Sequence, residues 1–341
     1  MTLPAPGGPL VGEYDAIICD IDGVVVAGAA AVPHAVEALG ALDVPVVFAT
    51  NNASRTPGQV AEHLRDLGVT VTEEDVLTSS LAAAQVLADR YPPGSEVLAV
   101  GGEGVGTSLR AVGLTPLTPG TKGAPVAVLQ GYGTQVTAAE LGEAACAIRG
   151  GAQWVATNTD LTLPTDRGPL PGNGSLVAAV RNCVDVDPEV IGKPHPPMYR
   201  LAARHLGLAT DRVLAIGDRL ETDIEGAVAT GMDGALVLTG VHGISDAAAA
   251  PARRRPTHVI EDLRGLEVPY PPAEQHEGWA LRGRARARVV DGVLEAEGSG
   301  IDADRACLDA VWAGVDAGLI TSTDAGRLVA SRYRGTPRPE E

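Results

Sequence analysis

The sequence predicts an α/β protein built around a parallel, Rossmann-like sheet. Short apolar runs alternate with amphipathic helical patterns in the first half of the chain, as in a doubly wound sheet. Polar clusters follow directly after these runs, where such sheets carry their chemistry. The 341 residues, 45% of them hydrophobic and 20% charged, suffice for two ordinary domains with packed cores.

The first elements follow in the order strand, helix, strand, helix. An apolar run at 15–19 predicts a strand, and the spacing of apolar residues at 31–42 predicts a helix. The run at 44–49 predicts the next strand, and the amphipathic pattern at 59–67 the next helix. Parallel strands need a crossover, usually a helix, so this alternation indicates a parallel sheet.

The pattern then restarts, which predicts a separate α/β unit inserted into the first domain, called the cap below. Further strands are expected, in chain order, at 97–100, 126–130, 154–156, 211–216 and 234–238. We therefore assign residues 1–80 and 188–270 to the core domain and 81–187 to the cap.

Residues 273–341 form a small α+β appendage behind a proline-rich break. Strands are expected at 280–290 and 293–297, and helices at 302–317 and 323–333. The appendage lacks the glycine loop that binds acetyl-CoA in acetyltransferases, so we expect no acetyl transfer. Its role is unknown, and docking or regulation is the default expectation.

The charge balance limits the partners. A net charge of −17 opposes binding to nucleic acid or to an anionic membrane surface. No apolar stretch approaches the ~20 residues that span a bilayer, and the N-terminus lacks the pattern of a secretory signal. We expect a cytoplasmic protein that acts on a small molecule, with a homodimer as an open alternative to a monomer.

The strongest chemical signal is Asp20-Ile21-Asp22-Gly23, directly after the first predicted strand. Carboxylates at positions i and i+2 of an extended chain project to one side. A calcium-binding EF-hand loop is excluded, because three valines follow where oxygen ligands are needed. Three more clusters close predicted strands: Thr50-Asn51-Asn52, Gly192-Lys193-Pro194, and Gly217-Asp218 with Asp223. A single sheet would gather all four at one crevice.

These motifs, in this order, resemble the haloacid dehalogenase superfamily of phosphatases. The residues of these motifs are most similar to those of the NagD-like and 4-nitrophenylphosphatase-like branch. Within it, the chain resembles glycerol-3-phosphate or phosphoglycolate phosphatases most. The likeness runs from about residue 15 to 268, includes the cap segment 156–176, and stops before the appendage. It implies a Rossmann-like core with an inserted C2-type cap.

The resemblance also implies a role for each motif. Asp20 would attack phosphorus to form an aspartyl-phosphate, and Asp22 would act as general acid and base. Lys193 would bridge Asp20 and the phosphoryl group. It is one of only two lysines among 26 cationic residues, which indicates that this position requires the compact charge of an ammonium group. The phosphoryl oxygens would be bound by Gly23, Thr50, Asn51, Asn52 and Lys193.

A Mg²⁺ site is implied as well. Asp20, the Asp22 carbonyl and Asp218 would supply the hard oxygen ligands that this ion prefers. Asp223 is assigned to the same site, directly or through water, with stabilisation of a helix N-terminus as the alternative. No residue of the appendage belongs to this set, so we expect removal of 273–341 to leave Mg²⁺ binding unaffected.

The cap predicts a small substrate, because a large cap closes over a site and excludes water. The polar specificity candidates in the loop at 158–174 are Asp160, Thr162 and Arg167. The cap has three aromatic residues, all outside this loop: Tyr91, Tyr132 and Trp154. Because aromatic stacking contributes roughly 1–3 kcal/mol to holding a base, a polyol or hydroxy-acid phosphate is favoured over a ring substrate.

Glycerol 3-phosphate is therefore the first expectation and 2-phosphoglycolate the second. A nucleotide or pyridoxal phosphate phosphatase remains an alternative. Two other classes stay open: a phosphotransferase or mutase, and a sensor that binds a phosphometabolite without turnover. Asp22 favours hydrolysis of a phosphate ester, since dehalogenation in this superfamily does not need the second carboxylate.

Overall fold

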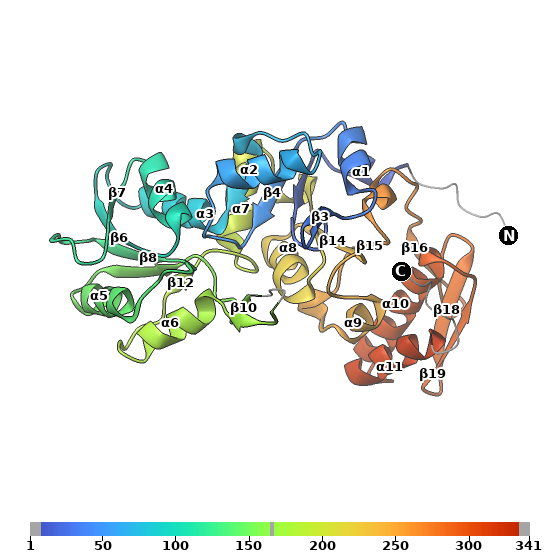
Figure 1. The fold of residues 1–341 in the computed structure, drawn as a ribbon. Coiled ribbons are helices and arrows are strands. Elements are labelled where there is room, and N and C mark those ends of the chain that lie inside the picture. Colours follow the sequence, from blue (N-terminus) through green and yellow to red (C-terminus); the bar gives the residue numbers. More distant parts are fainter. Residues whose placement is uncertain (1–7, 164–166, 334–341) are drawn as a thin grey trace. The chain divides into compact units, whose positions relative to one another are not determined.

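The computed structural model describes residues 8–163 and 167–333 (Figure 1). The chain divides into two compact units, the first formed by Met1–Pro45 with Leu208–Glu341 and the second by Val46–Gly207. The expected α/β class is confirmed in both units. The boundaries expected between core and cap fall after residues 80 and 187. They differ from the boundaries of these two units, and the division into core and cap stays a prediction.

The first unit contains four parallel strands in the order β15–β14–β13–β1. Their bounds are Ala16–Cys19 for β1, Val213–Gly217 for β13, Asp233–Val237 for β14 and His258–Ile260 for β15. Every residue of β1 and β13 is buried, as in strands covered on both faces. The register pairs Cys19 with Ile216, so Asp20 and Asp218 leave the sheet at the same edge.

Short helices and turns connect these strands. A small hairpin, β2 (Val26–Ala27) with β3 (Ala30–Ala31), follows β1 and delays the predicted helix, so that α1 spans Ala35–Ala41. The remaining helical segments are η1 (Leu10–Glu13), η3 (Thr210–Arg212), η4 (Leu220–Ile224), α8 (Glu225–Thr230), α9 (Ile244–Ala249), η5 (Ala252–Arg254) and η6 (Leu263–Leu266). The segment η4 is a π-helix, a form that is frequent at functional sites.

The appendage belongs to the same unit and forms an antiparallel sheet with two helices. The strands are β16 (Ala273–His276), β17 (Trp279–Arg282), β18 (Ala285–Val290) and β19 (Val293–Glu297), followed by α10 (Ile301–Asp316) and α11 (Ser322–Arg332). The expected last strand and both helices are confirmed. A single strand over 280–290 is wrong, because Gly283 adopts a φ of +56° and turns the chain between β17 and β18.

The second unit contains a five-stranded parallel sheet in the order β12–β9–β8–β6–β7. The bounds are Glu96–Val100 for β6, Thr115–Leu117 for β7, Ala127–Gln130 for β8, Gln153–Ala156 for β9 and Glu189–Val190 for β12. The strands predicted at 97–100, 126–130 and 154–156 are thus confirmed. Since β12 pairs with β9, this sheet extends beyond residue 187.

The same unit holds two further pairs of strands and six α-helices among its described residues. The strands are β4 (Val46–Thr50), parallel to β5 (Val76–Thr78), and the hairpin of β10 (Thr162–Leu163) with β11 (Leu170–Pro171). The helices are α2 (Pro57–Asp66), α3 (Ser79–Ala88), α4 (Glu103–Ala111), α5 (Ala138–Arg149), α6 (Asn173–Arg181) and α7 (Pro196–Leu206), with a 3₁₀ turn η2 at Glu73–Asp75. None of the described helices combines the length and apolar surface that crossing a bilayer takes.

A buried polar group lies in the first unit, near the start of β14 and β15. The Tyr14 hydroxyl donates to Asp233 Oδ2 (2.8 Å) and lies 2.6 Å from His258 Nε2. Burial disfavours the imidazolium, which lowers the pKa of His258 from 6.5 to about 4. His258 is therefore neutral in the folded protein at pH 7.

We expect the free energy of unfolding to decrease as the pH falls from about 6.5 to 4. In that range the unfolded chain protonates His258 and the folded chain does not, so protons favour unfolding. The difference in pKa limits this loss to roughly 3 kcal/mol. Chemical denaturation at several pH values should show a shallower pH dependence for His258→Gln than for the wild type. The exposed His276→Gln should keep the wild-type dependence, and equal slopes for all three proteins would contradict the assignment.

Candidate active site

Three carboxylates meet at the edge of the parallel sheet in the first unit. Asp20 follows β1, Asp218 follows β13, and Asp223 belongs to the π-helix η4. One carboxylate oxygen from each residue lies within 4.8 Å of the other two. The three residues are 8%, 1% and 3% exposed, respectively. The structure therefore brings together three of the four residues that the sequence assigns to the metal.

Asp218 is held from two sides. Its Oδ2 accepts a hydrogen bond from the Val241 amide (2.8 Å), and its carbonyl accepts one from the His242 amide (3.1 Å). His242 Nδ1 in turn accepts from the Leu220 amide (3.2 Å), and its Nε2 lies 3.4 Å from a Glu221 carboxylate oxygen. The loop after β14 thus holds both the carboxylate and the backbone of Asp218, and the π-helix contacts that loop through His242.

Glycines make room for these carboxylates. A Cβ atom added to Gly240 would lie 2.0 Å from Asp218 Oδ2, and one added to Gly23 would lie 2.3 Å from the same atom. A Cβ on Gly217 would lie 2.2 Å from Asp223 Cγ. Such distances are impossible without displacing a carboxylate. Sequence reasoning missed Gly240, although a glycine-containing polar segment at the end of a predicted strand is the signal that found the other motifs.

Asp223 is oriented by its own turn. Its Oδ2 accepts hydrogen bonds from the Arg219 amide (3.1 Å) and from the Thr222 hydroxyl (3.3 Å). Three buried carboxylates this close together favour a cation among them. An all-oxygen donor set of this kind fits a hard divalent ion such as Mg²⁺.

Asp22 lies in the turn after Asp20 and has a different environment. Its side chain is exposed, whereas that of Asp20 is buried. The Gly23 amide donates to the Val26 carbonyl (2.8 Å), and Gly23, with a φ of +86°, turns the chain there. The Thr239 hydroxyl donates to the Gly23 carbonyl (2.7 Å), which ties this turn to the loop that holds Asp218.

The second unit gathers a different set of predicted residues around Asn51. The Asn51 side-chain amide donates to Asp160 Oδ2 (3.2 Å) and to the Lys193 carbonyl (3.0 Å). Its own carbonyl accepts from the Ser79 hydroxyl (2.8 Å) and from Asn158 Nδ2 (2.7 Å). Asn51 therefore links the end of β4, the loop after β9 and the segment after β12.

Thr50 and Asn52 shape the same turn. The Asn52 amide donates to the Thr50 hydroxyl (3.0 Å), and Thr50 is buried at the end of β4. Asn52 Oδ1 accepts from both the amide and the hydroxyl of Ser54 (3.0 and 2.8 Å). Lys193, which is 5% exposed, follows β12. All four predicted clusters therefore lie at or just after the carboxyl end of a strand.

The three cap candidates differ in their surroundings. Asp160 is bonded to Asn51, whereas Thr162 and Arg167 are exposed at other points of the same loop. Sequence reasoning missed Ser79 and Asn158, which hold the Asn51 backbone, and Asn173, whose side-chain amide donates to the Asn158 carbonyl (2.7 Å). Ser79 is fully buried, and isolated polar residues on a buried helix give no such signal in a sequence.

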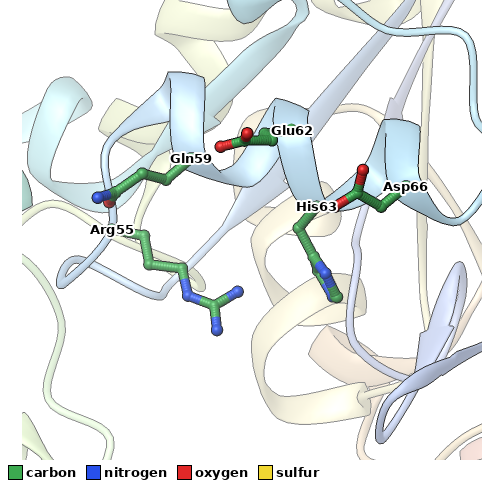
Figure 2. Close-up of a pocket in the computed structure, with 5 residues that line it drawn as sticks. All are labelled: Arg55, Gln59, Glu62, His63 and Asp66. Carbon is green, nitrogen blue, oxygen red and sulfur yellow. The ribbon is translucent and has the colours of Figure 1, made fainter.

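A surface hollow lies beside α2, apart from these clusters. Figure 2 shows Gln59, Glu62, His63 and Asp66 on the helix, with Arg55 on the segment before it. None of the five is a residue that the sequence assigns to catalysis, phosphate or metal. The hollow is a polar surface feature of α2 and is not the candidate site.

Comparisons with known proteins agree with this picture. A family model described as haloacid dehalogenase-like hydrolase matches residues 17–115, and a second haloacid dehalogenase hydrolase-like model matches 190–266. These segments contain the motifs from Asp20 to Asn52 and from Lys193 to Asp223.

Individual relatives are phosphatases. D-glycerol 3-phosphate phosphatase of Mycobacterium tuberculosis is 43% identical over 309 residues, which cover 88% of this chain and 86% of that protein. A 5′-nucleotidase of Bacillus subtilis is 37% identical over 264 residues, covering 75% of this chain and 98% of its own.

Solved structures give the same result. Glycerol phosphate phosphatase from Mycobacterium tuberculosis in complex with magnesium superposes with a TM-score of 0.81 at 40% identity, covering 90% of this chain and 92% of that one. A 4-nitrophenylphosphatase from Thermotoga maritima gives a TM-score of 0.70 at 27% identity, covering 76% and 98%. The resemblance read from the motifs is confirmed, and the chain belongs to the haloacid dehalogenase-like hydrolases, among the phosphatases of that family.

Proposed function

We propose that the protein is a Mg²⁺-dependent phosphatase that hydrolyses glycerol 3-phosphate. The proposal rests on how much of this chain is similar to D-glycerol 3-phosphate phosphatase. Residues ahead of the appendage number 272 of 341, about 80% of the chain, whereas the match to D-glycerol 3-phosphate phosphatase covers 88%. That likeness therefore reaches into the appendage. The nucleotidase and the 4-nitrophenylphosphatase match only 75% and 76% of this chain while covering 98% of their own.

The aromatic residues of the cap also favour a substrate without a ring. Trp154 is 4% exposed, and its indole N–H donates to Gln130 Oε1 (3.0 Å) inside the apolar cluster of the second unit. The Tyr91 hydroxyl donates to Gln153 Oε1 (3.1 Å). The Trp154 ring is thus used in packing and the Tyr91 hydroxyl is already hydrogen-bonded, which leaves Tyr132 among the three aromatic candidates named for the cap. A polyol phosphate needs hydrogen bonds rather than stacking.

The proposed reaction has two steps. Asp20 attacks phosphorus, the ester P–O bond breaks, and Asp22 gives its proton to the leaving alkoxide. Asp22 then removes a proton from water, which attacks the aspartyl-phosphate, releases inorganic phosphate and restores Asp20. The exposure of Asp22 supports its role, since a general acid and base must exchange protons with water. Asp20 lies among the carboxylates that would hold the metal, and that cation would keep the nucleophile ionised despite its burial.

The other proposed roles belong to the carboxylate cluster and to the cluster around Asn51. Asp20, Asp218, Asp223 and the Asp22 carbonyl would hold Mg²⁺, which would neutralise charge on the phosphoryl group. The phosphoryl oxygens are bound by Gly23, Thr50, Asn51, Asn52 and Lys193. Among the cap candidates Asp160 is supported best as a contact to the glycerol part, through its bond to Asn51, with Thr162 and Arg167 as further candidates.

Phosphate release from a panel of esters tests the proposal. We expect Mg²⁺-dependent turnover led by glycerol 3-phosphate over 2-phosphoglycolate, pyridoxal phosphate, UMP and 4-nitrophenyl phosphate, and no turnover in EDTA. A preference for UMP or pyridoxal phosphate would overturn the substrate and keep the mechanism. Absence of any turnover would overturn both. The cytoplasmic location and a homodimer remain predictions.

A further inference from the structure

The loop that fixes Asp218 runs directly into α9, a helix of only six residues. Thr239 bonds to Gly23, and Val241 and His242 bond to Asp218. Two residues after His242, α9 begins. A helix this short gains little from its own hydrogen bonds and depends on what it packs against. The packing of α9 therefore determines where the loop is held.

The appendage supplies much of that packing. Figure 1 shows α9 beside α10 and α11. The buried side chains of α9, which are Ile244, Ala247 and Ala248, belong to one apolar cluster with residues of β17, β18, α10 and α11. The cluster also contains Leu220 and Ile224 of the π-helix that carries Asp223. The appendage and the segments that bear the carboxylates thus share a single core.

Trp312 and Gly326 of the appendage lie directly against α9. The Trp312 indole N–H donates to the Ala247 carbonyl in the last turn of α9 (3.0 Å). At Gly326 of α11 a Cβ atom would lie 3.0 Å from the Ala249 Cβ and 3.1 Å from the Ser245 carbonyl oxygen. The two helices are this close because α11 has no side chain at that point.

A buried arginine attaches the appendage to the parallel sheet. Arg305 is 4% exposed, and its Nε and Nη2 both donate to the Val259 carbonyl on β15 (2.9 and 2.7 Å). Its guanidinium lies 3.9 Å from the centre of the Tyr270 ring. Since α10 is anchored to β15 in this way, it gives α9 a fixed surface to pack on.

We propose that the C-terminal appendage is a positioning element for the metal site. Helices α10 and α11 hold α9, and α9 holds the loop whose amides orient Asp218. Gly326 and Trp312 are positioning residues, since they contact neither the carboxylates nor a substrate. The effect on metal binding rests on the proposed function. This packing argues against the expectation that removing 273–341 leaves Mg²⁺ binding unaffected.

Substitution of Gly326 in the full-length protein tests the coupling. In Gly326→Val the new side chain pushes on α9. We expect hydrogen–deuterium exchange of peptides covering 239–243 in the metal-free protein to rise at least ~10-fold. The dissociation constant for Mg²⁺, measured by titration calorimetry, should rise about tenfold, as for residues that support metal ligands. Arg327→Val, on the exposed face of the same helix, should match the wild type in both measurements.

Trp312→Phe is the second variant, because it keeps an aromatic side chain and removes only the bond to Ala247. It should shift both measurements in the same direction by less. Unchanged exchange at 239–243 in both variants would overturn the inference. Faster exchange with unchanged Mg²⁺ affinity would also overturn it. If exchange at 239–243 is faster in the variants but the wild type itself binds no Mg²⁺, the coupling is supported and the proposed metal site is overturned instead.

Discussion

Replacing Asp20 by asparagine is expected to abolish turnover of every phosphomonoester while leaving the fold intact. The amide has no carboxylate oxygen with which to attack phosphorus, so we expect a loss of roughly 10⁴-fold or more in kcat. Asparagine has the same shape, and the backbone bond from residue 20 to the Ile216 carbonyl (2.9 Å) does not involve the side chain. Steady-state kinetics and a thermal melt of the metal-free protein measure the two effects separately.

Asp22→Asn is the matched comparison, because it removes proton transfer and keeps the nucleophile. General acid catalysis typically contributes about 10²–10⁴-fold, so a smaller loss than for Asp20→Asn is expected. The loss should be smaller for 4-nitrophenyl phosphate than for glycerol 3-phosphate, since nitrophenolate leaves without a proton. If Asp20→Asn keeps more than about one per cent of the activity, Asp20 is not the nucleophile.

The sequence predicted the site's strand-end residues because local rules govern them. A buried strand such as β1 is apolar along its whole length, so the polar residues that follow it, Asp20 and Asp22, are conspicuous in the sequence. The same holds for Asp218 after β13 and Thr50 at the end of β4. Since the carboxyl ends of parallel strands lie at one edge of a sheet, the polar residues that follow these strands are the first candidates for site residues.

Residues that hold the site in place were harder to predict, because their role depends on contacts distant in sequence. Ser79 bonds to Asn51 across 28 positions, and Val241 to Asp218 across 23. The role of the appendage also depends on contacts distant in sequence. Its helices were predicted from periodicity, but nothing in the pattern of α11 shows that Gly326 faces α9 rather than solvent. Only the packed structure joins 273–341 to the metal site.

Gly240→Ala is expected to have the second large effect, although it adds one methyl group to a residue that is exposed. The new Cβ would lie 2.0 Å from Asp218 Oδ2 and 2.5 Å from its Cγ, so the carboxylate must leave its position. Its bond to the Val241 amide is then lost. We expect the dissociation constant for Mg²⁺ to rise about 100-fold, with kcat/KM for glycerol 3-phosphate falling in parallel.

Gly243→Ala supplies the control three residues further along the same loop. A Cβ there comes no closer than 3.8 Å to Asp246 Oδ2, an ordinary contact, so Mg²⁺ affinity should stay within about twofold of the wild type. The two variants add the same atom to the same loop and differ in what it meets. If both bind Mg²⁺ as the wild type does, Asp218 is not a metal ligand. If both lose affinity alike, loop flexibility rather than the direct clash at Asp218 controls the metal site.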